Sequence, residues 1–271
     1  MHNGLKRLEE FVESQSQSGS MKYFYLSDPV SFPKKFKDNA DIETSAFVAA
    51  VFAIGPRYAI FRTLGRIFDQ LGKSPHESIM NLDHGAMKNQ LKDHIQFAYK
   101  NITGQDVVQI LYALKRLINS HGSIQDAARE GNDSETAFGL LNNLIEKMKS
   151  YEIPRSLGGE LTPRARALLA TPKQGSACKR MNMFLRWMTR KDEIDFGLYD
   201  WLGTDKLVIP LDVNVSRAAR KLDLTKRKTD NWKTAVEITQ RLKELDSVDP
   251  VKYDVPLFLY GMELRKNSRA S

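Results

Sequence analysis

The sequence of 271 residues predicts an all-α protein, and three observations favour this class. Apolar residues recur at helical spacing, as in residues 57–72 (RYAIFRTLGRIFDQLG), where Ile60, Leu64 and Ile67 share one face. The helical stretches are separated by Gly, Pro, Asn, Asp or Ser, which end and begin helices. No segment alternates apolar and polar residues convincingly, as a half-buried strand would.

The expected organisation is a flexible N-terminal arm at residues 1–20, followed by one helical body at residues 21–271 with two lobes. The arm contains a helical pattern at residues 5–13 but ends in the polar tract SQSQSGS. The first body helix is expected to be buried, with Asp41 as its N-cap and Gly55 at its end. Helices are expected at residues 41–55, 57–72, 75–82, 86–99, 104–120, 123–129, 134–149, 162–170, 179–190, 213–222, 230–245 and 248–262.

The positive charge is concentrated in one part of the chain. The formal net charge is +8, and residues 155–190 contain eight Lys or Arg but only one acid, Glu160. Such a balance attracts polyanions, including nucleic acid and acidic membrane surfaces. The window therefore points to a nucleic-acid interface more specifically than the net charge alone.

The single cysteine and the five histidines argue against disulfide, iron–sulfur and zinc sites. Cys178 is the only cysteine, which rules out an intrachain disulfide and a Cys-ligated iron–sulfur cluster. The five histidines lack the spacing of a zinc site, so we expect neither a metal nor another cofactor. No apolar run is long enough to span a membrane, and no signal-peptide pattern opens the chain. We expect an intracellular, cytoplasmic protein with no membrane partner.

Residues 172–190 form the first motif that could carry chemistry. Gly175 is expected to break the preceding helix and Ser176 to cap the next one, whose free N-terminal amides and positive dipole end favour a phosphate. Lys179, Arg186 and Arg190 fall on one face of that helix, opposite an apolar face. The alternative is a solvated face whose arginines pair with acids elsewhere in the chain. The clustered charge and the preceding turn favour phosphate binding.

The second motif is PLDVNVSRAARKL, residues 210–222. Asp212 suits the N-cap of a helix over residues 213–222, and Pro210 disfavours helix before it. Taken alone, an aspartate at this position is ordinarily a structural cap. A functional role needs support from a second motif.

Together the two motifs resemble the helix-hairpin-helix superfamily of DNA base-excision glycosylases, which includes endonuclease III and the archaeal 8-oxoguanine glycosylases. In that superfamily a hairpin LPGVGxK supplies a nucleophilic lysine and a segment VDTHVxRV supplies an essential aspartate. Lys179 and Asp212 are similar to these residues, and their separation is nearest to that of the archaeal branch. From about residue 22 to residue 264 the chain also resembles an uncharacterised bacterial family, through GSACKRMNMFLRWM, IPLD and DPVKYD.

The resemblance implies a two-lobed helical bundle with a DNA cleft between the lobes, acting as a monomer on lesion-containing double-stranded DNA at the bacterial nucleoid. Lys179 would attack the sugar of a flipped nucleotide and form a Schiff base that permits strand cleavage, assisted by Asp212. This is base-excision repair by a glycosylase with AP-lyase activity, with an oxidised purine favoured. The hairpin here, PKQGSACK, departs from LPGVGxK, so Lys179 could instead contact a phosphate. The implied DNA-binding residues are Gly175, Ser176, Arg180, Arg186, Arg190 and Arg217.

Several alternatives remain open at this stage. If Lys179 does not attack, Asp212 could help water do so in a monofunctional glycosylase. A non-catalytic protein that binds damaged DNA, or one that binds RNA or a modified nucleoside, is also compatible with the charge. Cys178 is best explained as a small packing residue. The possible walls of a base pocket, each better explained as core, are Phe52, Phe184, Trp187, Tyr199 and Trp201.

Overall fold

The computed structural model describes residues 3–18, 28–83, 85 and 102–270. Over these residues it contains helices and isolated β-bridges but no strand, so the all-α prediction is confirmed. None of the helices in these ranges is long and apolar enough to cross a membrane. The helix expected at residues 86–99 lies outside the described residues.

The chain divides into two compact units. Unit 1 comprises Met1–Leu26 and Pro172–Ser271, and unit 2 comprises Ser27–Thr171. The chain therefore enters unit 1, builds unit 2 and returns to complete unit 1. Both motifs that the sequence analysis identified, around Lys179 and Asp212, belong to unit 1.

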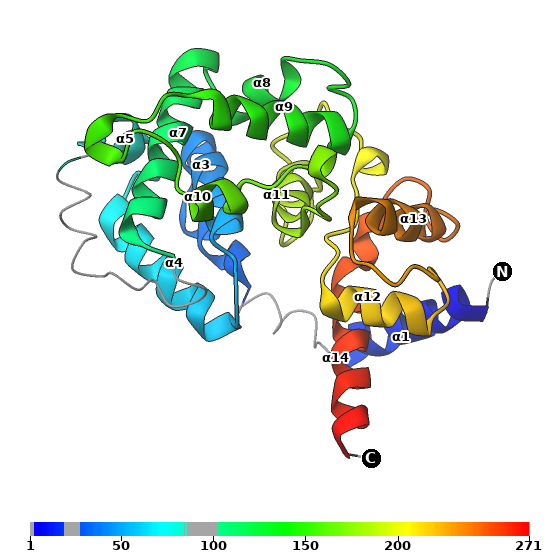
Figure 1. Cartoon of the computed structure of the whole chain (residues 1–271). Helices are drawn as coiled ribbons and strands as arrows, with labels where there is room; N and C mark the ends of the chain where they lie inside the picture. The colour runs from blue at the N-terminus through cyan, green and yellow to red at the C-terminus, as the bar shows by residue number, and fades with distance from the viewer. Residues whose placement is uncertain (1–2, 19–27, 84, 86–101, 271) are drawn as a thin grey trace. The chain divides into compact units, whose positions relative to one another are not determined.

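Unit 2 is a cluster of helices around α3 (Figure 1). Eleven of the thirteen residues of α3 are buried, which confirms the expected central helix. The helix ends at Val51 rather than at Gly55. The described elements of unit 2, with η marking a 3-10 helix, are η1 (Pro29–Ser31), η2 (Pro33–Lys35), α3 (Asn39–Val51), α4 (Arg57–Leu71), α5 (Pro75–Met80), α7 (Gly104–His121), α8 (Ile124–Arg129), α9 (Ala137–Ser150), η3 (Arg155–Leu157) and α10 (Pro163–Leu168).

Two buried carboxylates of α3 cap neighbouring helices. Asp41 accepts hydrogen bonds from the backbone N–H of His76 at 2.8 Å and from the hydroxyl of Ser74 at 3.0 Å, at the start of α5. Glu43 accepts from the first backbone N–H groups of α8. The expected N-cap at Asp41 is therefore wrong: Asp38 caps α3, and Asp41 serves another helix.

Unit 1 contains the two candidate motifs on separate helices. Its described elements are α1 (Asn3–Ser18), η4 (Pro172–Gln174), α11 (Lys179–Thr189), η5 (Thr204–Lys206), α12 (Val213–Lys221), α13 (Trp232–Leu242), η6 (Pro250–Tyr253) and α14 (Asp254–Ala270). Helices α12 and α14 pack closely, because Gly261 of α14 leaves no side chain between its backbone and the carbonyl of Asn214.

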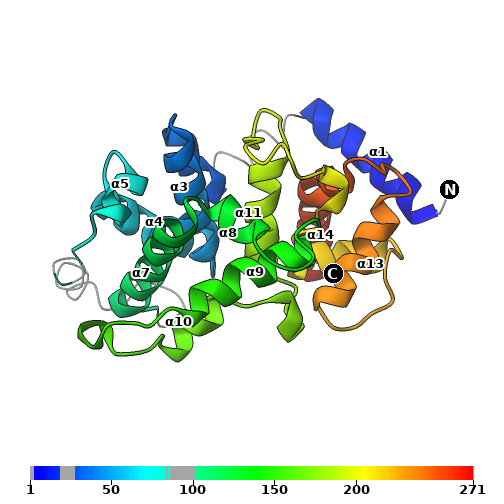
Figure 2. The same cartoon turned by 90° about the horizontal axis from the view of Figure 1, so that it is seen from above.

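The N-terminal helix α1 is an integral part of unit 1 rather than a flexible arm. It packs against α14 (Figures 1 and 2), where Phe11 meets the ring of Tyr260 edge to face at 5.1 Å. Leu5 and Leu8 are fully buried in the same hydrophobic cluster as residues of α12 and α13. The helical pattern at residues 5–13 is confirmed, and the flexible arm is wrong for residues 3–18, because their apolar face has a partner in the C-terminal helix.

Replacing Gly261 by alanine should destabilise unit 1. An added Cβ atom would overlap the carbonyl oxygen of Asn214, so α12 and α14 must move apart, at a cost of about 1–3 kcal/mol. All three tryptophans of the chain lie in unit 1, so urea unfolding followed by tryptophan fluorescence reports this loss. Gly65→Ala in α4 is the control, since its Cβ meets nothing within 4 Å; because α4 belongs to unit 2, unfolding of both variants is also followed by far-UV circular dichroism. An unchanged midpoint for Gly261→Ala would refute the close-packing argument.

Candidate active site

The turn before α11 places Lys179 at the first position of that helix. Gly175 has a φ of 81°, and Ser176 forms a β-bridge with Asn231. Cys178, with a φ of 48°, is the N-cap of α11 and makes no side-chain capping bond. The prediction that Ser176 caps α11 is wrong: its hydroxyl accepts a hydrogen bond from the N–H of Cys178 instead.

Lys179 and Asp212 come together in unit 1. The Lys179 Nζ lies 3.7 Å from Oδ2 of Asp212, and the two side chains are 35% and 22% exposed. The other oxygen of Asp212, Oδ1, accepts hydrogen bonds from the N–H groups of Asn214 and Val215 at 2.8 and 2.9 Å. Asp212 is thus the expected cap of α12, and it also presents an oxygen to an accessible lysine.

Asp254 is a third ionisable group near this pair, and sequence reasoning missed it. It is the first residue of α14, and its Oδ2 accepts from the Arg186 guanidinium at 2.5 Å. Burial raises the pKa of Asp254 to about 6; Arg186 and Lys179 oppose this shift and Asp212 adds to it. The only sequence signal for this residue is its place in the DPVKYD segment, which the resemblance singled out without a role.

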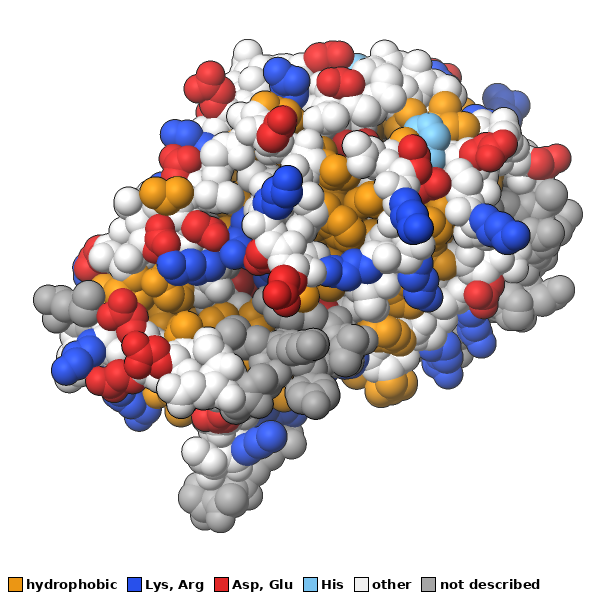
Figure 3. Space-filling model, turned by 180° about the vertical axis from the view of Figure 1, so that it is seen from behind, with side chains coloured by type: hydrophobic (Ala, Val, Ile, Leu, Met, Phe, Trp, Pro, Cys, Tyr) orange, Lys and Arg blue, Asp and Glu red, His pale blue; other side chains and the backbone are white. Residues whose placement is uncertain are grey.

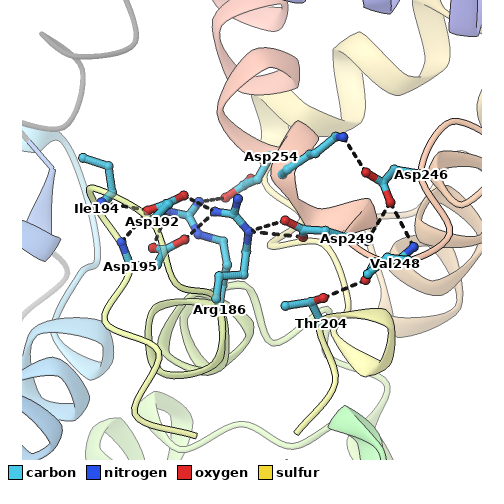
Figure 4. Close-up of polar contacts among 11 residues, drawn as sticks. Arg186, Asp192, Ile194, Asp195, Thr204, Asp246, Val248, Asp249 and Asp254 are labelled. Atoms are coloured by element: carbon cyan, nitrogen blue, oxygen red, sulfur yellow. Dashed lines mark hydrogen bonds and ion pairs between the residues drawn. The ribbon is translucent and has the colours of Figure 1, made fainter. Parts of the chain in front are cut away.

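Arg186 and Arg190 are not free to bind DNA. Arg186 is 4% exposed and its guanidinium bridges Asp195 and Asp254 (Figure 4). Arg190 pairs with Asp192, Asp195 and Asp249. The prediction that these two arginines contact DNA is therefore wrong, and the alternative of arginines paired with acids elsewhere in the chain holds for both.

The remaining expected DNA-binding residues have differing environments. Arg217 is half-buried and donates to the Asn214 side chain and the Gly261 carbonyl, so it ties α12 to α14. Arg180 is half-buried, and burial lowers its pKa to about 10. Gly175 is exposed and Ser176 half-buried. Among these four residues, Gly175 in the turn before α11 is the most exposed.

The surface charge is mixed on the face that Figure 3 displays. Figure 3 shows Lys and Arg side chains interspersed with Asp and Glu over the face that it displays. Within residues 155–190, Arg155, Arg166 and Lys173 are exposed, whereas Arg186 is buried. Part of the positive charge in that window therefore balances buried carboxylates.

The aromatic residues considered for a base pocket are mostly core. Phe52, Phe184, Trp187 and Tyr199 are fully buried, and Trp201 stacks on Tyr199 with ring centroids 5.6 Å apart. Cys178 is buried too, as its packing role predicts. In the described ranges, no group of three or more His, Cys, Asp or Glu side chains is suited to holding a metal ion.

Comparison with known proteins assigns the chain to a family. A family model described as a protein of unknown function (DUF2400) matches residues 28–263, and the chain belongs to this family. The match covers Lys179, Asp212 and Asp254 and leaves out the whole of α1. Comparisons with curated proteins and with solved structures gave no match.

Replacing Arg186 by methionine should strongly destabilise unit 1. The change leaves the carboxylates of Asp195 and Asp254 without this partner, and breaking a buried ion pair on one side costs about 3–5 kcal/mol. Because Asp254 becomes protonated as the pH falls through about 6, the loss should be smaller at pH 5 than at pH 8.

Urea unfolding followed by tryptophan fluorescence at the two pH values tests this prediction. Arg241→Met is the matched control, because Arg241 forms an exposed pair with Glu244 and such pairs contribute about 1 kcal/mol or less. Equal losses for the two variants would contradict the structural importance of Arg186.

Proposed function

We propose that this protein is a DNA base-excision glycosylase with AP-lyase activity and the two-lobed bundle of the helix-hairpin-helix glycosylases. The observation that carries the proposal is the 3.7 Å approach of Lys179 to Asp212, with both side chains accessible. The resemblance assigns to these positions a nucleophile and its acidic partner. The two residues are 33 positions apart in the sequence. In the fold they lie close together at the starts of α11 and α12, both in unit 1.

The chemistry begins at the lysine. An ammonium cannot attack, so Lys179 must first lose a proton, and Oδ2 of Asp212 lies where it could accept it directly or through one water molecule. The neutral amine then attacks C1′ of a flipped nucleotide while the glycosidic C–N bond breaks. The bonding electrons leave with the base, which takes up a proton. When Asp212 passes the lysine proton on to the departing base it becomes an anion again, and it then stabilises the positive charge that develops on the sugar.

Strand scission follows from the same covalent bond. Opening of the sugar ring gives an iminium between Lys179 and C1′, which acidifies the C2′ proton. Loss of that proton drives electrons toward C3′ and expels the 3′-phosphate, so the strand is cut by β-elimination. Hydrolysis of the iminium then frees the lysine. An oxidised purine is the proposed target, on the basis of the resemblance to the archaeal 8-oxoguanine branch.

Borohydride trapping should capture this intermediate. The probes are duplexes that each carry one lesion, including 8-oxoguanine, uracil, a methylated purine and an abasic site. Reduction of the iminium links the protein to DNA, and Lys179→Gln should abolish both the adduct and strand scission. Asp212→Asn should slow base release by about 100-fold or more while DNA binding survives.

Lys206 and Asp205 supply matched controls. They form an ion pair of 3.3 Å with both side chains well exposed, so Lys206→Gln and Asp205→Asn change the same charges without touching the site. Both variants should keep full activity. No adduct on any duplex would reject the lyase, and alkali-revealed base loss would then distinguish a monofunctional glycosylase from a non-catalytic DNA-binding protein.

A further inference from the structure

We propose that the basic segment of unit 1, residues 226–233 (KRKTDNWK), is a second DNA contact of this protein and binds the phosphate backbone beside Lys179. The segment comprises the end of the connection between α12 and α13 and the first turn of α13 (Figure 1). The inference deepens the proposed function and rests on it, because it names what holds the DNA while Lys179 acts. Neither the family match nor the resemblance assigns a role to this segment.

The basic segment lies against the turn that leads into α11. Ser176 of that turn and Asn231 of the segment form an antiparallel β-bridge, and the N–H of Trp232 donates to the carbonyl of Gly175 at 3.2 Å. Bridged residues have Cα atoms about 4.5–5.5 Å apart. Lys179 follows Ser176 by three residues, a stretch that spans at most about 11 Å even when fully extended. The segment therefore passes close to the start of the helix that carries Lys179.

The same segment is tied to α12, the helix that Asp212 caps. The guanidinium of Arg220 donates to the carbonyl of Arg227 at 2.8 Å and to the carboxylate of Asp230 at 2.5 Å. Asp230 also accepts a hydrogen bond from the hydroxyl of Ser216 at 3.0 Å. The segment is thus joined both to α12 and to the turn before α11. Its shape is fixed before a ligand arrives, which lowers the entropic cost of binding.

The segment carries positive charge that the protein leaves uncompensated. It contains four Lys or Arg and one acid, Asp230, which pairs with Arg220. Arg227 has only a distant partner, with its Nη1 atom 3.9 Å from Oε2 of Glu237. The lysines of the segment are all exposed, and within the described part of the chain none of them has an ion pair with an acid. These lysines are Lys226, Lys228 and Lys233.

This arrangement differs from that of the basic window at residues 155–190. Arg186 and Arg190 of that window are paired with buried or half-buried acids, whereas the lysines of the basic segment keep their charge at the surface. Duplex DNA carries one negative charge per about 1.7 Å of its axis, and lysine binds phosphate as a point charge. A lysine cluster beside a residue that must reach C1′ of a nucleotide fits the phosphates that flank this nucleotide.

The salt dependence of DNA binding tests this contact. The probe is a fluorescent duplex with one reduced abasic site, which has no aldehyde and forms no Schiff base, and its binding to the full-length protein is followed by anisotropy. Lys226→Gln, Lys228→Gln and Lys233→Gln should each weaken binding and lower the slope of log Kobs against log salt by up to about 0.9, the value for one phosphate contact. The triple variant should lower the slope by about 2 to 3.

Lys206→Gln is the matched control, because it removes the same charge from an exposed lysine of unit 1 outside the segment. It should keep the wild-type slope, and Lys228→Arg, which preserves the charge, should keep it too. The triple variant should retain the wild-type midpoint of urea unfolding, since its three side chains are exposed and form no ion pair with the described residues.

Strand scission separates a contact residue from a catalytic one. On an ordinary abasic duplex under single-turnover conditions, the triple variant should need a higher protein concentration for its half-maximal rate, yet reach the wild-type rate at saturation. Lys179→Gln should cut at no concentration. A triple variant whose saturating rate falls while its salt slope stays at the wild-type value overturns the proposed backbone contact.

The outcomes distinguish the two proposals. A wild type that binds the probe with a slope that depends on the three lysines, but forms no adduct and cuts no abasic site, rejects the glycosylase and supports the contact. An active wild type whose slope is unchanged in the triple variant overturns the contact and leaves the glycosylase intact. Tighter binding to single-stranded RNA of the same length than to the duplex, lost in the triple variant, also overturns the inference, because the partner is then RNA.

Discussion

The unit that carries Lys179 and Asp212 depends on the buried guanidinium of Arg186. A cation that is 4% exposed cannot be hydrated, and it is stable only where carboxylates replace the water. Those carboxylates come from Asp195, nine residues later, and Asp254, sixty-eight residues later. The ion pairs therefore fix the start of α14 against α11. Because α12 packs on α14 through Gly261, they also fix where Asp212 meets Lys179.

Unit 2 also contains buried charged groups that need partners in place of water, but it supplies those partners differently. Two of its buried carboxylates, Asp41 and Glu43, are satisfied by backbone N–H groups at the starts of α5 and α8. The free N–H groups at a helix start need acceptors, and a buried carboxylate needs donors, so one contact satisfies both. In unit 1, α12 and α14 also have an aspartate at their starts, Asp212 and Asp254. There, however, each carboxylate pairs with a cationic side chain, Asp212 with Lys179 and Asp254 with Arg186.

The sequence predicts local features of this fold well, because they depend on neighbouring residues. Helical spacing and the Gly-Pro signals located α4 between Pro56 and Gly72, and α12 begins at Val213 with Asp212 as its N-cap, as expected. The approach of Lys179 to Asp212 was anticipated only through a resemblance, since no spacing rule relates residues 33 positions apart.

The errors arise where a side chain finds a partner far along the chain. A polar-tailed helix at residues 3–18 looks like an arm until α14 covers its apolar face. Arg186 and Arg190 look like a DNA-binding face because their acids lie in later segments. Asp41 looks like the cap of its own helix because nothing in the neighbouring sequence indicates that the start of α5 packs against it. In each case the local pattern was correct, and a long-range contact changed its use.

The two explanations of Asp212, structural cap and functional carboxylate, are not exclusive. A carboxylate has two oxygens, and here Oδ1 accepts from the α12 backbone while Oδ2 faces Lys179. The cap fixes the orientation of the carboxyl group, so the second oxygen is held in place without further contacts. An asparagine could keep the capping oxygen yet lose the charge, whereas an alanine would lose both. The capping role is thus compatible with the proposed catalytic one, because a side chain that is to react must first be held in place.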